Sequence, residues 1–117
     1  MNDSILSTIR KLCTSFGDAD ETLDTDLLVQ INTIINRLYQ IGIIKKRGFI
    51  IEDESTLWSE LFDSLEDANN KAMVKSYIEL RVKLLFDPPQ SSTVMESMKQ
   101  QIKEFEWCMY REENYNE

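Results

Sequence analysis

The stretch KAMVKSYIELRVKLLFDPP, residues 71–89, carries the clearest indication of the fold. Its apolar residues recur at helical spacing and cover a broad face of one helix. They are Met73, Val74, Tyr77, Ile78, Leu80, Leu84 and Leu85, with Val82 and Phe86 extending the face towards the back. A helix with so wide an apolar surface needs neighbours on several sides, and we therefore expect it at the centre of the protein. Pro88 and Pro89 cannot continue it, so the chain turns away there.

The same periodicity predicts four further helices, at about residues 4–16, 24–41, 56–65 and 93–113. Asp3, Ser55 and Thr93 are suitable N-caps, and Glu96 completes a capping box with Thr93. Gly42 suits the left-handed position that ends the second helix. We therefore expect an all-α fold, a single-domain bundle of about five helices over residues 1–113, followed by a flexible tail at 114–117.

Residues 43–53 form the one short segment without helical period, and they contain the extended-looking run Phe49-Ile50-Ile51. A single strand leaves its backbone groups unpaired. The segment can form a hairpin with residues 43–44, pack as coil, or pair with another subunit. The preceding run Lys45-Lys46-Arg47 is either a solvated turn or a contact, together with Phe49, with a neighbouring protein.

Composition argues against catalysis and against nucleic-acid binding. The 117 residues carry a net charge of −8 and include no histidine, which removes the commonest general base and metal ligand. No phosphate-binding glycine loop or nucleophile motif occurs, and the acidic pairs lie in loops where solvation explains them. We expect no enzyme activity, no cofactor, no metal and no membrane span. Cys13 and Cys108 lack CxxC spacing, which favours reduced, packed thiols.

Arg81 lies in the middle of the apolar face of residues 71–86. One interpretation is a side chain whose stem packs while its guanidinium reaches water. The other is an inter-helix or inter-subunit ion pair, which requires a carboxylate partner because an unpaired buried charge is strongly destabilising. The sequence does not identify that partner.

Trp107 is the second unusual residue. The predicted core face of the last helix is made of Val94, Met95, Met98, Ile102, Phe105 and Met109. Trp107 projects away from this face, among polar residues, which is typical of an interface anchor. It is core instead if the helix packs between two neighbours within one subunit.

Three patches together resemble one family, the small head-tail connector (adaptor) proteins of siphophages and prophages of Gram-positive bacteria. The first is Asp24-Thr25-Asp26 leading to Gly42, and the second is residues 48–53 with Trp58 soon after. The third is residues 78–89 leading into Glu104-Phe105-Glu106-Trp107. The order and spacing of these patches carry the resemblance, since the family has no catalytic signature.

The resemblance implies a virion protein at the head-tail interface, assembled in the host cytoplasm. Twelve subunits would form a ring below the portal protein, extend the DNA channel and dock a stopper or tail-completion protein. DNA would pass through without specific binding. In such proteins the C-terminal helix and tail contact the portal, and Trp107, Tyr110, Arg111 and Tyr115 match that position by order along the chain.

A different class of function is an acidic regulator that mimics DNA and occupies a basic cleft on a host protein. The charge of −8 permits it, but 13 Lys and Arg are interspersed with the acidic residues, so no long face of one sign is evident. An enzyme or metal-binding module is the third and weakest alternative.

Overall fold

A computed structural model describes residues 4–13, 21–45, 48–65, 70–86 and 88–115, without the side chains of residues 13, 21–23 and 110–115. Five helices make up most of this part: α1 (Ile5–Cys13), α2 (Glu21–Gln40), α3 (Trp58–Asp63), α4 (Lys71–Phe86) and α5 (Ser92–Tyr115). The described ranges contain no strand, and their only β-type contacts are isolated bridges, Ser4 to Leu57 and Ile44 to Leu65. The predicted all-α fold of about five helices is confirmed.

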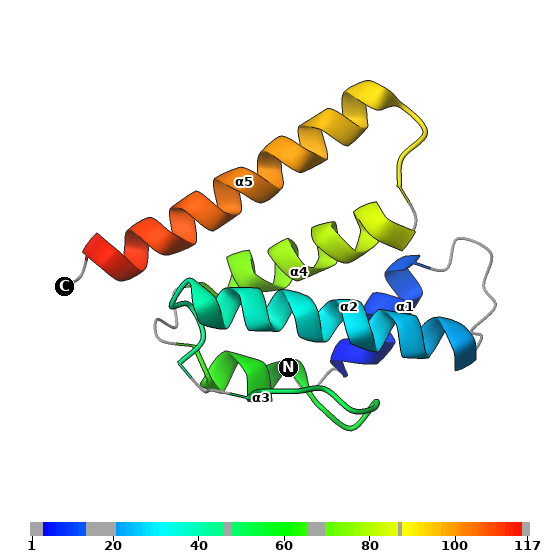
Figure 1. Ribbon diagram of the computed structural model, residues 1–117, viewed down its shortest axis with the longest axis horizontal. Helices are drawn as coiled ribbons and strands as arrows, with labels where there is room; N and C mark the ends of the chain where they lie inside the picture. Colours follow the sequence, from blue (N-terminus) through cyan, green and yellow to red (C-terminus); the bar gives the residue numbers. More distant parts are fainter. Residues whose placement is uncertain (1–3, 14–20, 46–47, 66–69, 87, 116–117) are drawn as a thin grey trace.

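Helix α4 occupies the centre of the molecule, as its wide apolar face predicts. It packs against α1, α2 and α5, and Figure 1 shows it between α2 and α5. Val74, Tyr77, Ile78 and Val82 are fully buried. The prediction was wrong about Leu85, which is 58% exposed. Because three helices surround α4, nearly all of its circumference is covered, and the remaining open side falls at Leu85.

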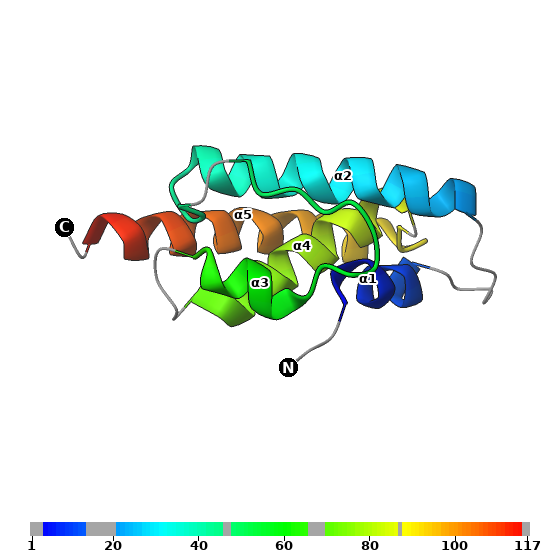
Figure 2. The ribbon, with the colours of Figure 1, turned by 90° about the horizontal axis from the view of Figure 1, so that it is seen from below.

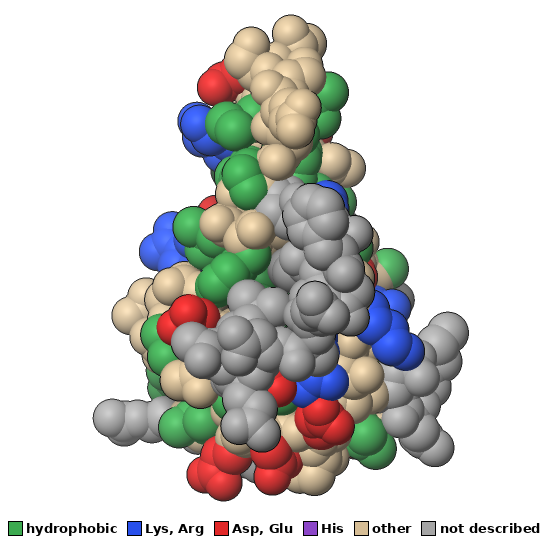
Figure 3. Space-filling view, turned by 90° about the vertical axis from the view of Figure 1, so that its right-hand side faces the viewer, with side chains coloured by type: hydrophobic (Ala, Val, Ile, Leu, Met, Phe, Trp, Pro, Cys, Tyr) green, Lys and Arg blue, Asp and Glu red, His purple; other side chains and the backbone are tan. Residues whose placement is uncertain are grey.

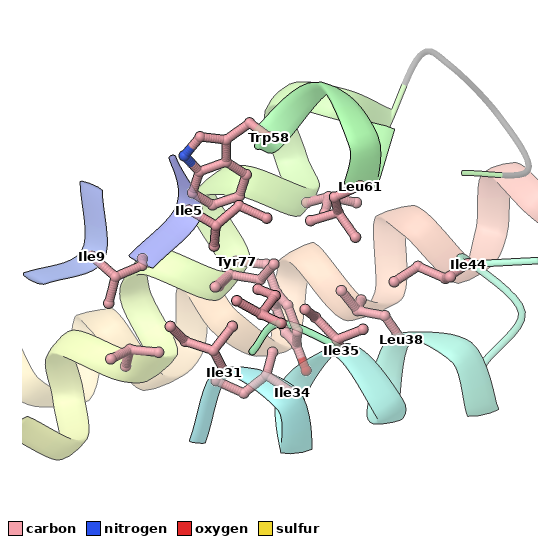
Figure 4. Close-up of a cluster of buried hydrophobic side chains, with 14 of the residues drawn as sticks. Ile5, Ile9, Ile31, Ile34, Ile35, Leu38, Ile44, Trp58, Leu61 and Tyr77 are labelled. Atoms are coloured by element: carbon pink, nitrogen blue, oxygen red, sulfur yellow. The ribbon is translucent and has the colours of Figure 1, made fainter. Parts of the chain in front are cut away.

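The core forms where α1, α2, α3 and α4 meet, beneath the segment that follows α2. Figure 4 shows the largest buried side chains converging from these elements. They include Ile5, Ile9, Ile31, Ile34, Ile35, Leu38, Ile44, Trp58, Leu61 and Tyr77. Trp58 also donates a hydrogen bond from its indole Nε1 to Thr8 Oγ1 at 3.1 Å, which joins α3 to α1. The buried indole therefore has its polar atom satisfied.

Helix α2 ends as its sequence predicts, at Gly42 with φ +87°. The amide of Ile43 donates to the carbonyl of Leu38 at 2.9 Å, and the amide of Gly42 donates to that of Tyr39 at 3.1 Å. These two bonds define a Schellman motif, and the accompanying apolar residues Leu38 and Ile43 are both buried. The helix begins at Glu21, three residues before the predicted start.

The helix starts differ from the predicted caps. Ser4 Oγ accepts the amide of Ser7 at 3.2 Å and so caps α1, whereas Asp3 lies outside the described residues. Ser91, not Thr93, caps α5, since its Oγ accepts the amide of Val94 at 3.3 Å. In both cases a neighbouring residue that is also suited to capping competes for the position, and the direction of the incoming chain decides between them.

Helix α3 is shorter than the predicted 56–65. The carbonyl of Thr56 accepts the amide of Ile5 at 3.1 Å, so the chain is still extended there and pairs with the start of α1. Leu57 is the N-cap residue, and Glu60 Oε2 accepts its amide at 2.7 Å. The predicted cap, Ser55, instead donates its amide to Asp53 Oδ1 at 2.8 Å in the preceding turn.

The segment between α2 and α3 packs as coil within its own subunit, one of the three possibilities left open by the sequence. Figure 2 shows it crossing alongside α2 before it enters α3. The Asn32 side chain of α2 holds it through two bonds to the backbone of Ile51. The amide of Ile51 donates to Asn32 Oδ1 at 2.8 Å, and Asn32 Nδ2 donates to the carbonyl of Ile51 at 2.9 Å. One side-chain amide thus replaces the partner strand for this residue.

Candidate interaction surfaces

Helix α5 presents Trp107 to solvent. The apolar stripe of this helix is buried at Ile102 and Met109, and Phe105 packs partly against the core. Trp107 lies off that stripe with 62% of its surface exposed. The alternative in which Trp107 is core within one subunit is therefore excluded. The backbone of Tyr110, Arg111 and Tyr115 belongs to α5, but their side chains lie outside the described part of the chain.

An ion pair joins α5 to α2 next to Trp107. Arg37 Nη2 of α2 lies 3.3 Å from Glu106 Oε1 of α5. Both groups are partly open to water, so this pair adds little to overall stability. The buried stripe residues Ile102 and Met109 set which side of α5 faces the body, and Trp107 therefore lies on its outer side beside the ion pair.

The N-terminal half of α5 stands clear of the body. Figure 3 views the molecule from this end and shows the projecting helix with hydrophobic side chains along it. Val94, predicted as core, is 47% exposed, and Leu85 of α4 is exposed near the same end. The helix diverges from α4 towards this end (Figure 1), so the upper part of its stripe lacks a partner within the subunit.

Arg81 bonds to a phenol, and no carboxylate among the described residues pairs with it. Its Nη1 donates to Tyr77 Oη at 2.7 Å, and its guanidinium carbon lies 5.5 Å from the centre of the Tyr77 ring. The residue is half-buried. Tyr77 itself is fully buried, and the Glu106 carboxylate is close enough to influence the pKa of its phenol. Two polar pairs, Arg81 with Tyr77 and Arg37 with Glu106, therefore lie near each other where α4, α5 and α2 meet.

Burial and two neighbouring charges determine the protonation state of the Tyr77 phenol. Burial raises the pKa of its phenol above the ordinary tyrosine value, because the charged form is poorly solvated there. Arg81 opposes the shift through its hydrogen bond and its charge, and Glu106 adds to it. The phenol is therefore neutral near neutral pH and accepts the hydrogen bond from Arg81.

Arg10 forms a contact that the sequence did not indicate. Its Nε and Nη2 donate to the two carboxylate oxygens of Asp24 at 2.8 Å each, and its Nη2 also pairs with Glu54. This fork-like geometry is the strongest form of an arginine–carboxylate contact. It ties α1 to α2 and to the loop before α3. No local signal could reveal it, because 14 and 44 residues separate the partners.

The candidate contact residues after α2 lie in different settings. Lys45 is exposed, and its amide donates to the carbonyl of Ser64 at 2.9 Å. Phe49 packs partly against the core, whereas Ile50 beside it is 60% exposed. Lys46 and Arg47 lie outside the described residues. A hollow of about 350 Å³ opens between α2 and this segment, lined by Asn32, Thr33, Ile35, Asn36, Tyr39, Gly48, Phe49 and Ile50.

Within the described ranges, no group of three or more Cys, Asp or Glu residues is placed to hold a metal ion. None of the described helices combines the length and the apolar character needed to cross a bilayer. Cys108 is a free thiol and is exposed, which contradicts the expectation that it is packed. The side chain of Cys13 lies outside the described part. What stands out is a set of exposed apolar and aromatic groups on an acidic, helical body, which is the pattern of a protein that binds other proteins.

Comparison with known protein families agrees that this is a protein that binds other proteins. The model of the phage connector protein family matches residues 5–116, and the chain belongs to that family. No curated protein and no solved structure is similar enough to this chain to be matched. Members of the family are structural connectors, and membership implies a component of the virion that contacts other head or tail proteins.

Proposed function

We propose that this chain is the head-tail adaptor of a tailed phage. In this role it forms a ring of about twelve subunits below the portal protein, extends the DNA channel and docks the stopper or tail-completion protein. It acts by binding and not by catalysis. The family match over residues 5–116 is the observation that carries this proposal.

Helix α5 supplies the surface proposed for the portal. Trp107 presents a large exposed indole on a helix whose opposite face is buried at Ile102 and Met109. Buried tryptophans at the centre of an interface are among the residues that contribute most to binding. Tyr110, Arg111 and Tyr115 continue the same helix towards the C-terminus and are proposed to extend the contact.

The acidic charge suits a channel for DNA. Twelve copies at −8 each would place about −96 on the ring, so its wall would not adhere to a polyanion. Lys45, Lys46 and Arg47 are the strongest local exception. We propose that they contact an acidic patch on a neighbouring protein and do not grip phosphates.

The test combines the chain with the portal protein encoded in the same phage genome. Light scattering after gel filtration measures the mass of the complex, and electron microscopy shows whether a ring caps the portal. We expect a complex with one adaptor per portal subunit. Trp107→Ala should weaken attachment about 30-fold, from a loss of roughly 2 kcal/mol. Val29→Ala is the matched control, because Val29 is another large exposed side chain, on α2. A mixture that stays unassembled, or equal losses in both variants, would refute the proposal.

A further inference from the structure

Helix α5 begins in a projecting end that carries no net charge. Residues 88–95, which we call the α5 tip, contain no charged side chain. In the next turn Glu96 pairs with Lys99 at 3.7 Å, so these two charges offset each other. Ser91 caps the first turn by accepting the amide of Val94, and the tip is therefore helical although it stands clear of the body. Figure 3 shows mainly hydrophobic and uncharged atoms at this end.

The hollow between α2 and the segment that follows it is a second uncharged surface. Its volume is about 350 Å³, and all of its lining residues are neutral. Asn32, Thr33 and Asn36 line it from α2, and Phe49 and Ile50 line it from the other side. Ile50 is 60% exposed. A concave surface of aromatic, aliphatic and neutral polar groups suits an uncharged, partly apolar partner.

Both surfaces come from unusual parts of the sequence. Residues 27–36 and 88–95 are its two longest stretches without a charged side chain, although 29% of all residues are charged. Burial explains the apolar members of the first stretch. It does not explain Thr33 and Asn36, which are neutral and exposed on the outer side of α2. Two exposed surfaces of an acidic protein are thus free of the charges that cover the rest.

The net charge of the chain identifies a second copy as the partner. Copies at −8 each repel one another, so they associate favourably only through surfaces that carry no charge and bury apolar groups. The α5 tip and the hollow meet this condition, and one projects while the other is concave. Figure 1 shows them on opposite sides of the molecule: α5 rises away from the body at its N-terminal end, and the segment after α2 follows the lower border. One copy can therefore contact two neighbours at once.

We propose that the α5 tip of one copy docks into the hollow of the next, with Val94 against Phe49 and Ile50. The two contacting surfaces differ, so the contact is head-to-tail and repeats from copy to copy. Contacts of this kind close into a ring when the rotation between neighbours allows it. The inference rests on the proposed adaptor ring and names the surfaces that join its subunits. Trp107 lies outside both surfaces and stays accessible to the portal.

Sedimentation velocity of the full chain without the portal tests the contact, over concentrations from about 10 μM to about 1 mM. We expect the mean sedimentation coefficient to rise with concentration beyond that of a dimer. Raising the salt from about 20 mM to about 500 mM should strengthen association, because salt screens the repulsion between acidic copies.

One variant in each surface shows which residues carry the association. Val94→Asp and Ile50→Asp each introduce a charge at an exposed position, so circular dichroism should show an unchanged fold. Each should weaken association about tenfold or more, since the new carboxylate loses its water in the contact. Trp107→Asp is the matched control, because Trp107 is equally exposed but lies outside both surfaces, and it should leave association unchanged.

A mixture of the two variants tests the head-to-tail geometry. The Val94→Asp copy keeps an intact hollow, and the Ile50→Asp copy keeps an intact α5 tip. Together they have one intact contact, so the mixture should form a dimer and stop there. A two-fold contact between identical surfaces would leave one variant associating normally by itself. That result, a mixture that stays monomeric, or an original chain that is monomeric at about 1 mM would overturn the proposal.

The portal complex separates this inference from the adaptor role. A portal that binds no copies would refute the adaptor role and leave the contact between copies standing. Intact rings on the portal with both Val94→Asp and Ile50→Asp would refute the contact and leave the adaptor role standing.

Discussion

Asn32 is the residue whose replacement most directly tests how the coil segment is held. Asn32→Ala removes two hydrogen bonds, of 2.8 and 2.9 Å, to the backbone of Ile51. Each such bond contributes about 0.5–1.5 kcal/mol net, and the loss is larger when the remaining groups stay buried. Ile51 is buried. We therefore expect the free energy of unfolding to fall by about 2–4 kcal/mol, a large fraction of the roughly 5–15 kcal/mol typical of a domain.

Urea denaturation followed by circular dichroism measures this loss. With a slope of about 2 kcal/mol per molar urea, the midpoint should fall by about 1–2 M. Asn36→Ala is the matched control, since Asn36 lies one turn further along α2 and is exposed. It should change stability by less than about 0.5 kcal/mol.

Hydrogen exchange separates global from local loss. If the segment alone detaches in Asn32→Ala, the amide of Ile51 should lose its protection while the amides of α4 keep theirs. A variant with an unchanged midpoint and a protected Ile51 amide would show that the two bonds do not hold the segment. Equal effects of Asn32→Ala and Asn36→Ala would show that the change acts through the helix and not through the two hydrogen bonds between Asn32 and Ile51.

Three further outcomes are expected. Because burial raises the pKa of Tyr77, the folded state keeps its proton longer than the unfolded state, so the free energy of unfolding should fall as pH rises above about 10. Tyr77→Phe should flatten this alkaline loss, and an identical pH profile would refute the assignment. Trp107→Ala should leave the free energy of unfolding of the isolated chain within about 0.5 kcal/mol of the original, since most of the indole is exposed; a loss of several kcal/mol would place Trp107 in the core. The isolated protein should not bind labelled duplex DNA at about 150 mM salt, with or without Lys45→Ala and Lys46→Ala, whereas micromolar binding that weakens steeply with salt would reveal a phosphate-contacting surface.

Local sequence signals predicted the helices well where one strong feature dominates. The extent of α4 follows from its apolar repeat and from the two prolines after it, and both of its predicted ends are correct. The end of α2 follows from Gly42. Its backbone takes a left-handed conformation with positive φ, which glycine adopts without the steric cost that other residues have. The start of α2 was the least accurate, three residues after the observed one, and the caps of α1, α3 and α5 were assigned to the wrong neighbours, since several hydroxyl or acidic residues compete for each cap.

Exposure was harder to predict than helix formation. The apolar stripe of α5 reads as continuous from Val94 to Met109, yet only its C-terminal half is covered. A helical repeat shows which residues share a face, but the angle at which α5 crosses α4 decides how far that face is buried. The same angle leaves Leu85 exposed and lets Val82 be enclosed.

By itself the sequence determined the all-α fold, the central place of α4, the turn at Gly42 and the position of Trp107 away from the apolar stripe of its helix. These properties depend on spacing within one element. Only the tertiary structure decided the partners of Arg10, Asn32 and Arg37, which lie 14 to 69 residues away along the chain. Polar contacts over such separations leave no periodic trace, because one carboxylate or amide among many is selected by the packing of whole helices. The sequence therefore shows which surfaces must be buried, and the packing then selects which polar groups meet.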